Sequence, residues 1–300
     1  MLSILIPVYN QDVRNLAYTL AKQCMKQNIN FQILCFDDMS QEKFRLKNRE
    51  LASIMNINYT ELSENLGRSR IRNWLGKSAY FDYLLFLDGD SAVRDRDFIK
   101  KYLQCLPTDK IIYGGRSYQL KRPANGKKVL HWLYGKTREC PPAKARNKEP
   151  YLNFQSNNFL IPRSIFEKCT FDISLAGYGY EDLQYAEKLR NCDVEILHIP
   201  NPVFHEGLEN NHVFLKKSAN AIANLVQLNK NKKLLDTRLI RFYESLHNLK
   251  MLPVFLWVAK TFSAQIEGNL LSKRPSIWLF SLWKIEKYHQ LMTGSPAIND

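Results

Sequence analysis

The chain has 300 residues, 45% of them hydrophobic, with 12 glycines and 12 prolines and without internal repeats. This composition excludes a low-complexity or repeat protein and indicates a globular fold with a sizeable core. The formal net charge of +14 favours an anionic partner, such as a nucleic acid, a membrane surface or a phosphorylated substrate.

The first ninety residues alternate between apolar strands and helical segments. Near-continuous apolar runs predict strands at 2–8, 31–37, 57–62 and 83–88, and helices are expected at 12–27, behind an Asp12 cap, at 42–54 and at 67–79. Apolar strands that alternate with helices predict an α/β fold: a mostly parallel, Rossmann-like sheet with helices on both faces. In such sheets ligands bind beyond the carboxyl ends of the strands.

The remaining chain changes character twice. Residues 121–150 carry nine Lys and Arg against two Glu and are predicted to form a long basic loop. Strands and helices resume over 150–210, and only helices are expected from 211 to 300. We therefore predict one domain over 1–210, with halves at 1–115 and 150–210 on either side of this basic segment, followed by a C-terminal helical extension over 211–300.

The six cysteines are scattered without a Cys-x-x-Cys pair, which favours reduced thiols over a disulfide framework or a zinc site. The first apolar run is short and contains Pro7, unlike a secretory leader. Charged residues interrupt the apolar stretches near the C-terminus, so no transmembrane helix is expected. These features predict a cytoplasmic protein.

Acidic residues follow two of the predicted strands. Asp88 and Asp90 bracket a glycine after the fourth strand, where they could hold a divalent cation that binds phosphate oxygens, or form an ordinary Asp-Gly turn. Asp37 and Asp38 end the second strand, where one carboxylate could accept an N–H from a nucleotide base. The alternative is that Asp38 or Ser40 caps the helix that begins near Glu42.

Three further motifs could contribute to a site. Arg68 and Arg72 are four residues apart and share a helix face that suits phosphate, or simply solvent. Glu181 and Asp182 follow a Gly-Tyr-Gly-Tyr segment and open a helix, where acids also stabilise the helix dipole. His205 lies between a strand and a turn, and a lone histidine there can be structural or a ligand.

Together these motifs resemble the GT-A fold glycosyltransferases of the large inverting family 2. The resemblance rests on SILIPVYN, FDDMS, NLGRSRIRN, FLDGDS and GYGYEDLQYAEKL, in this order over residues 2–205. The last motif also looks like the C-terminal segment of galactosyltransferase-type enzymes. The resemblance implies transfer of one hexose or N-acetylhexosamine from a UDP-sugar to a hydroxyl of a glycan or lipid-linked acceptor, in surface polysaccharide or glycoconjugate biosynthesis.

The resemblance also implies that 1–210 is the catalytic domain, with a nucleotide-binding half at 1–115 and an acceptor half at 150–210, and it implies roles for individual residues. The nucleotide and the donor sugar would contact Pro7, Val8, Tyr9, Asp38, Arg68, Arg72 and Asp88. Tyr9 would stack on the uracil ring and Asp38 would accept its N3–H. Asp90 and His205 would hold Mn²⁺ or Mg²⁺ on the diphosphate. Asp182 would be the catalytic base and Glu181 would orient a sugar.

Two departures from the family pattern matter. The acceptor motif has Tyr178-Gly179-Tyr180 where related enzymes often have Trp-Gly, and the chain has no Gln-x-x-Arg-Trp motif. The second absence and the lack of membrane spans argue against a processive synthase. The basic segment 121–150 is a candidate lid over the donor.

The C-terminal helices carry their own hypothesis. Trp257, Trp278 and Trp283, with basic residues nearby, predict a peripheral contact of residues 251–292 with anionic lipid at the cytoplasmic membrane face. The alternative is packing within the protein or in an oligomer. Two other function classes fit parts of the sequence less well. A nucleotidyltransferase needs a glycine-rich phosphate loop after the first strand, and IPVYNQD has no glycine. The basic charge could suit a nucleic-acid-binding module, but the sequence has no known binding motif, so no nucleic-acid partner is expected.

Overall fold

The computed structural model describes residues 1–174, 179–230 and 236–294, which divide into two compact units. The sheet unit comprises Met1–Tyr118, Glu139–Ser174 and Glu181–Gly207. The helical unit comprises Gln119–Arg138, the described part of 175–180 and the described residues from Leu208 onward. Each unit has its own core.

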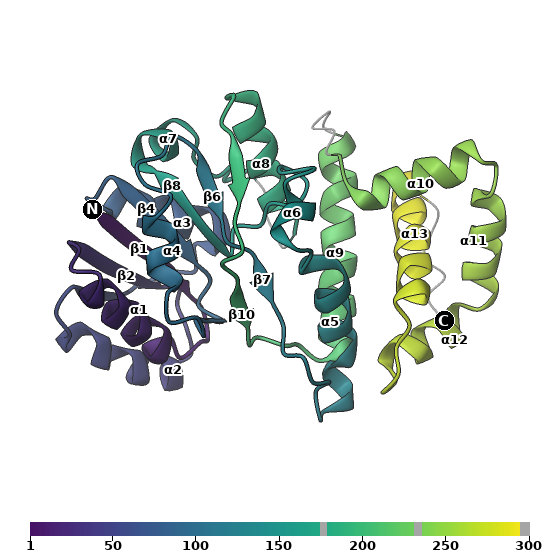
Figure 1. Ribbon diagram of the computed structural model, residues 1–300. Coiled ribbons are helices and arrows are strands. Elements are labelled where there is room, and N and C mark those ends of the chain that lie inside the picture. Colours follow the sequence, from purple (N-terminus) through teal and green to yellow (C-terminus); the bar gives the residue numbers. More distant parts are fainter. Residues whose placement is uncertain (175–178, 231–235, 295–300) are drawn as a thin grey trace. The chain divides into compact units, whose positions relative to one another are not determined.

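A seven-stranded sheet forms the centre of the sheet unit, in the order β3-β2-β1-β4-β8-β6-β9 (Figure 1). Its strands are β1 (Leu2–Val8), β2 (Phe31–Asp37), β3 (Ile57–Glu61), β4 (Tyr83–Leu87), β6 (Ile111–Tyr113), β8 (Asn158–Pro162) and β9 (Ile196–His198). Strand β8 runs antiparallel to both of its neighbours, whereas the other pairs are parallel. The predicted mostly parallel α/β sheet is confirmed.

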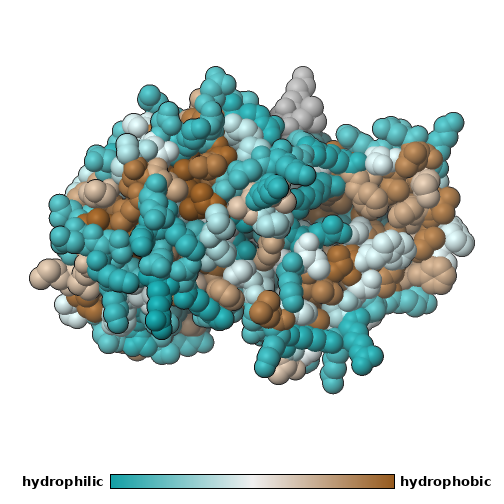
Figure 2. Space-filling model, in the orientation of Figure 1, coloured by the Kyte–Doolittle hydropathy of each residue, from teal (hydrophilic) through white to brown (hydrophobic). Residues whose placement is uncertain are grey.

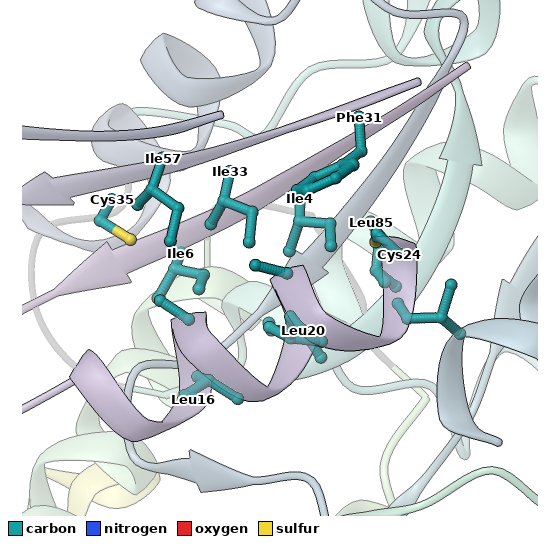
Figure 3. Close-up of a cluster of buried hydrophobic side chains, with 14 of the residues drawn as sticks. Ile4, Ile6, Leu16, Leu20, Cys24, Phe31, Ile33, Cys35, Ile57 and Leu85 are labelled. Atoms are coloured by element: carbon teal, nitrogen blue, oxygen red, sulfur yellow. The ribbon is translucent and has the colours of Figure 1, made fainter. Parts of the chain in front are cut away.

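Helices cover both faces of this sheet because each central strand is apolar on both sides. Ile4 and Ile6 of β1 pack with α1 (Arg14–Lys26) and α4 (Phe98–Leu103), as Figure 3 shows for α1. Leu5 of the same strand belongs to the opposite core, with α3 (Gly67–Ser78), α7 (Arg163–Lys168) and α8 (Glu181–Asn191). Side chains alternate along a strand, so one apolar run supplies both cores.

Two local expectations need correction. Helix α1 begins at Arg14 with Val13 at the N-cap position; Asp12, one residue earlier, accepts a 3.4 Å hydrogen bond from the Arg14 backbone N–H and forms an ion pair with the Arg14 guanidinium at 2.9 Å. The expected helix at 42–54 divides into α2 (Glu42–Asn48) and the 3-10 helix η1 (Arg49–Ser53).

The segment 121–150 is largely helical, so the prediction of a long loop is wrong. It contains η2 (Gly126–Lys128), α5 (Val129–Tyr134), the π-helix η3 (Gly135–Glu139) and α6 (Ala143–Arg146). The physical reason is the short apolar stretch inside the basic run: Val129 and Leu130 are buried, so α5 has a core-facing side. The surrounding Lys and Arg residues masked this pattern in the sequence.

The helical unit contains α5 and five C-terminal helices. These are α9 (Asn211–Lys230), α10 (Arg238–Asn248), α11 (Leu252–Thr261), α12 (Ser263–Leu271) and α13 (Ile277–Thr293). Aromatic contacts form the core of the unit, with Phe280 packing on Tyr134, Phe214 and Trp283. Within the described ranges, no helix combines the length and the apolar character that a membrane span requires. All six cysteines are free.

Candidate active site

A second, three-stranded sheet in the sheet unit brings distant residues to the end of β4. Its strands are β5 (Ser91–Ala92), β10 (Val203–His205) and β7 (Arg116–Ser117), with β10 in the middle. Ser91 pairs with His205 in antiparallel register, which places Asp90, one residue earlier, beside the imidazole. Parallel pairing of β10 with β7 brings Arg116 to the same region.

Asp90 and His205 form a close acid–imidazole pair, with 3.4 Å between Asp90 Oδ1 and His205 Nδ1. Burial opposes the charged form of Asp90, but contact with His205 and the charges of Arg116 and Arg68 outweigh it and hold the pKa of Asp90 well below its usual range. A Cβ at Gly207 would lie 2.7 Å from Asp90 Oδ2, so a larger residue there would displace the Asp90 carboxylate.

These two residues fit a partial site for Mn²⁺ or Mg²⁺. Asp90 supplies an ionised carboxylate and His205 an imidazole nitrogen, and both donor types suit Mn²⁺. Among the described residues, no group of three or more His, Cys, Asp or Glu side chains could hold a metal ion. A cation bound by one or two protein groups completes its coordination with substrate phosphates and water.

Asp88 lies between two arginines from different elements. Its Oδ1 accepts a hydrogen bond from Arg72 of α3 at 2.5 Å, and its Oδ2 lies 3.5 Å from an Arg116 nitrogen. The glycine between the two acids also has a packing role, since a Cβ at Gly89 would lie 3.0 Å from the carbonyl oxygen of Pro7. The Asp-Gly-Asp segment therefore packs against the end of β1.

Arg116 belongs to a partly buried polar cluster that the sequence analysis missed. Its guanidinium lies 3.3 Å from Glu139 Oε2, and the same oxygen accepts a hydrogen bond from the Tyr118 hydroxyl at 2.5 Å. The charges of Asp88 and Asp90 also act on Arg116. A Gly-Gly-Arg run directly after β6 was the available sequence signal, because it places a cation after the end of a buried strand.

Glu181 and Asp182 occupy the first turn of α8 but have different partners. Arg68 of α3 donates a hydrogen bond to Glu181 Oε1 at 2.7 Å. Burial opposes ionisation of Glu181, but the Arg68 charge and hydrogen bond prevail and lower its pKa. The predicted helix face of Arg68 and Arg72 therefore contacts two acidic motifs, with Arg68 on Glu181 and Arg72 on Asp88.

The neighbouring Asp182 behaves in the opposite way. Burial first, and then the negative charge of Glu181, raise the pKa of Asp182 to about 6. The Arg72 charge and a hydrogen bond from the Ser156 hydroxyl at 2.5 Å oppose this shift only in part. Ser156 was also missed, although the polar run Gln155 to Asn158 before a buried strand offered a signal.

Electrostatic interactions connect the acidic motifs from the two halves of the sheet unit. Arg68 acts on both Asp90 and Glu181, while Asp88 and Arg72 act on Asp182. The structure thus brings together the predicted site residues of α3, of the β4 end, of the α8 start and of β10.

The predicted nucleotide-binding residues lie at the ends of β1 and β2. Val8 is buried, while Tyr9 is 56% exposed, as a ring that stacks on a ligand can be. The Asp38 carboxylate accepts hydrogen bonds from the backbone N–H groups of Leu66, at 2.6 Å, and Gly67, at 3.0 Å. Asp38 therefore caps the start of α3 and not the Glu42 helix considered above; its role toward uracil stays a prediction.

Asp37, the alternative partner for the base, is buried and uses both carboxylate oxygens for hydrogen bonds within the protein. It is 0% exposed, and its two oxygens accept hydrogen bonds from Ser40 N at 2.7 Å and from the Tyr59 hydroxyl at 2.7 Å. Within the acceptor motif, Tyr178 lies outside the described residues. Tyr180 is described and belongs to the helical unit.

Comparisons with known proteins agree with this arrangement. A family model described as Glycosyl transferase family 2 matches residues 3–170, more than half of the chain. A stretch of 121 residues, 39% of this chain, is 31% identical to the chondroitin synthase of Escherichia coli and spans 17% of the length of that protein.

Two solved structures share the fold at low sequence identity. The mannosyltransferase PcManGT from Pyrobaculum calidifontis, in complex with GDP-Man and Mn²⁺, has a TM-score of 0.58 and 15% identity over 98% of this chain and 88% of that chain. TarS 1-349 from S. aureus has a TM-score of 0.53 and 15% identity over 98% and 90% of the two chains. The family assignment also sets aside the nucleotidyltransferase and nucleic-acid-binding alternatives. The chain belongs to glycosyl transferase family 2 and is a glycosyltransferase with the GT-A fold.

Proposed function

We propose that this enzyme transfers one hexose or N-acetylhexosamine from a UDP-sugar to a hydroxyl group of a glycan or lipid-linked acceptor, with inversion at the anomeric carbon. The observation that carries the proposal is the contrast between Glu181 and Asp182: one carboxyl group is held ionised, while its neighbour has a pKa of about 6. Paired carboxyl groups with separated proton affinities indicate an acid–base assignment.

Asp182 is the proposed base. A carboxylate with a pKa near 6 is mostly ionised at neutral pH and yet binds a proton more strongly than an ordinary aspartate. It can therefore accept the proton of the acceptor hydroxyl as that oxygen attacks the sugar. The Ser156 hydroxyl fixes its orientation through Oδ1, and Glu181, fixed by Arg68, is placed to orient a sugar.

The leaving UDP gains negative charge as the anomeric C–O bond breaks. Asp90 and His205 would hold Mn²⁺ or Mg²⁺ at this point, and the cation would stabilise that charge when bound. Arg72 and Arg116 add fixed positive charge around Asp88, which is proposed to contact the ribose or the donor sugar. Pro7, Val8, Tyr9 and Asp38 are proposed to hold the uracil.

The relatives support a nucleotide-sugar donor without deciding its base. One structural neighbour is described with GDP-Man and Mn²⁺, and TarS 1-349 with UDP. The chondroitin synthase resemblance supports a glycan product, although this chain aligns with only 17% of that protein. We assign catalysis to residues 1–210, place the enzyme in the cytoplasm in surface polysaccharide or glycoconjugate synthesis, and keep the lid role of 121–150 as a prediction.

A thermal-shift screen of UDP, GDP and CMP, with and without Mn²⁺, tests the donor assignment. We expect UDP to stabilise the protein only with Mn²⁺, by about 2.7 kcal/mol when UDP is present at about 100 times its Kd. Asp90→Asn should remove the Mn²⁺ dependence, because it removes the carboxylate beside His205, whereas Asp109→Asn, at an exposed position, should not.

Two results of this screen would contradict the proposal. Preference for GDP or CMP over UDP would overturn the uracil assignments for Tyr9 and Asp38. Stabilisation by none of the nucleotides, with or without Mn²⁺, would remove the nucleotide-sugar donor itself.

A further inference from the structure

Helix α11 presents an apolar stripe to solvent. Val254 and Trp257 on the helix are 59% and 64% exposed, and Met251 and Phe262 at its two ends are each 45% exposed. Met251, Val254 and Trp257 are three residues apart and so lie along one side of the helix, and together with Phe262 at its C-terminal end they form a stripe. Figure 2 shows hydrophobic residues gathered over the region where Figure 1 places α10 and α11.

A different side of α11 packs inside the helical unit. Leu252 and Ala259 are buried, and Phe255 contacts Phe242 of α10 edge to face at 6.2 Å. A surface helix usually turns polar residues outward, but the only charged residue within α11 is Lys260. A surface of large apolar side chains on an otherwise packed helix marks an interaction site.

The charge around the stripe indicates the partner. No acidic residue occurs from Ser245 to Ile266, whereas Lys250 and Lys260 flank the exposed stripe and both are exposed. Lys273 and Arg274 follow α12 and are also exposed. A second copy of the chain would bring the same lysines together across a two-fold axis, which opposes association. An anionic surface would be attracted by them.

We propose that the α11 stripe (Met251, Val254, Trp257 and Phe262) inserts into the interface of a membrane that contains anionic lipid, with Lys250 and Lys260 at the level of the phosphates. Tryptophan with flanking lysine is the combination that favours the lipid–water boundary. With ten residues, α11 is too short to span a bilayer and would lie in its plane.

The proposal narrows the predicted membrane contact of residues 251–292 to α11. Trp283 of α13 is 7% exposed and packs on Phe280 inside the unit, so it cannot reach a lipid surface. Of the three tryptophans considered, Trp257 is the most exposed. The proposal concerns the helical unit and does not depend on the nature of the donor or acceptor.

Co-sedimentation of the full chain with vesicles tests this proposal. We expect binding to vesicles of phosphatidylcholine with phosphatidylglycerol, weak binding to phosphatidylcholine alone, and a decrease at high salt, because ions screen the lysine contribution. Trp257→Gln should lower the partition coefficient by about tenfold or more, while Trp257→Phe retains most of the binding. Lys260→Glu should lower it by about fivefold or more.

Matched control variants distinguish binding through this stripe from nonspecific adsorption to vesicles. Met55→Gln removes an apolar side chain that is 84% exposed in the sheet unit, and Lys26→Glu reverses an exposed charge in the same unit. Both should bind vesicles like the unchanged protein. Equal sedimentation with all vesicles, or Trp257→Gln binding as well as the unchanged chain, would overturn the proposal. So would concentration-dependent self-association that is lost in Trp257→Gln without any vesicle binding.

Discussion

Two adjacent carboxyl groups at the start of α8 differ in proton affinity because their neighbours differ. Glu181 accepts a hydrogen bond from the Arg68 guanidinium at 2.7 Å, whereas Asp182 accepts one from the Ser156 hydroxyl and feels the Arg72 charge against the negative charges of Glu181 and Asp88. A hydrogen bond from a neutral hydroxyl offsets burial less than one from a guanidinium does. The proposed roles of orienting group and base thus follow from which of the two carboxylates accepts the arginine hydrogen bond.

Asp182→Asn should abolish transfer while leaving UDP binding nearly unchanged, because it removes the proton acceptor and keeps the shape of the side chain. In the unchanged enzyme, activity should fall as the pH drops through about 6, the pKa of Asp182. A pH–rate profile and UDP titrations of both proteins measure these effects. Loss of UDP binding in the variant would show that Asp182 belongs to the donor site.

The same pKa shift predicts a stability effect. The pKa of Asp182 rises from 3.8 to about 6 on folding, so the folded state resists its ionisation and loses stability as the pH rises from 3.8 to about 6. At pH 8, Asp182→Asn should therefore stabilise the protein by on the order of 2 kcal/mol, with little effect below pH 4. Thermal unfolding at both pH values measures the difference; equal shifts would contradict the assignment.

Arg116 is a site residue that the sequence analysis did not single out, although the Gly-Gly-Arg run after β6 contains it. Its guanidinium contacts Glu139 and Asp88, so Arg116→Met should lower kcat by about a hundredfold, as for loss of one charge-stabilising donor. Arg116→Lys should recover part of this loss, because the charge remains. The matched control is Arg94→Met, since Arg94 is exposed and lies over the Phe204 ring of β10. An Arg116→Met enzyme with unchanged kcat and a lower Tm would reduce Arg116 to a purely structural residue.

At the scale of elements, the close contact between α3 and α7 carries a further prediction. A Cβ at Gly76 of α3 would lie 2.1 Å from the Phe166 ring of α7, and Phe166 is fully buried. Gly76→Ala should therefore destabilise the sheet unit by about 1–3 kcal/mol through overpacking. Gly268→Ala in α12 is the control: nothing lies within 4 Å of its Cβ position, so higher helix propensity should stabilise by up to about 1 kcal/mol. Thermal unfolding of both variants tests the pair, and equal effects would contradict it.

The strands and the helices of the first half could be predicted because their signals are local. β1 and β2 are continuous apolar runs, and α3 begins where NLGRSR predicts a helix. Because Asp38, Asp88 and Asp90 follow predicted parallel strands, they could be placed at the same edge of the sheet, where the structure has them. Ser156 could not be paired with Asp182 in advance, because the contact depends on β8 returning antiparallel beside β4.

The helical unit was harder to predict for a different reason. In α13, apolar residues cover most of the helix, so periodicity cannot distinguish the buried Trp283 from the 59% exposed Trp278. In α5, a six-residue helix is too short to give a clear period inside a basic segment. Only the packing of Phe214, Phe280 and Tyr134 shows which side faces inward.

At the scale of the whole molecule, the two units are interleaved along the chain. Helix α5 belongs to the helical unit, but it occurs between β7 and β8 of the sheet unit. Its partners are distant in sequence: Leu130 N donates a hydrogen bond to Asn211, and His131 stacks on Phe214 at 4.6 Å.

A protein cut after Gly207 would therefore retain α5 while losing the surface that shelters Val129 and Leu130. Deleting the C-terminal helices is thus a poor way to obtain a minimal catalyst, because the shortened protein would expose the apolar side of α5 between two strands. The interleaved chain also constrains recombination. A single crossover cannot exchange one whole unit, because the helical unit needs both the C-terminal helices and the segment Gln119–Arg138 that contains α5.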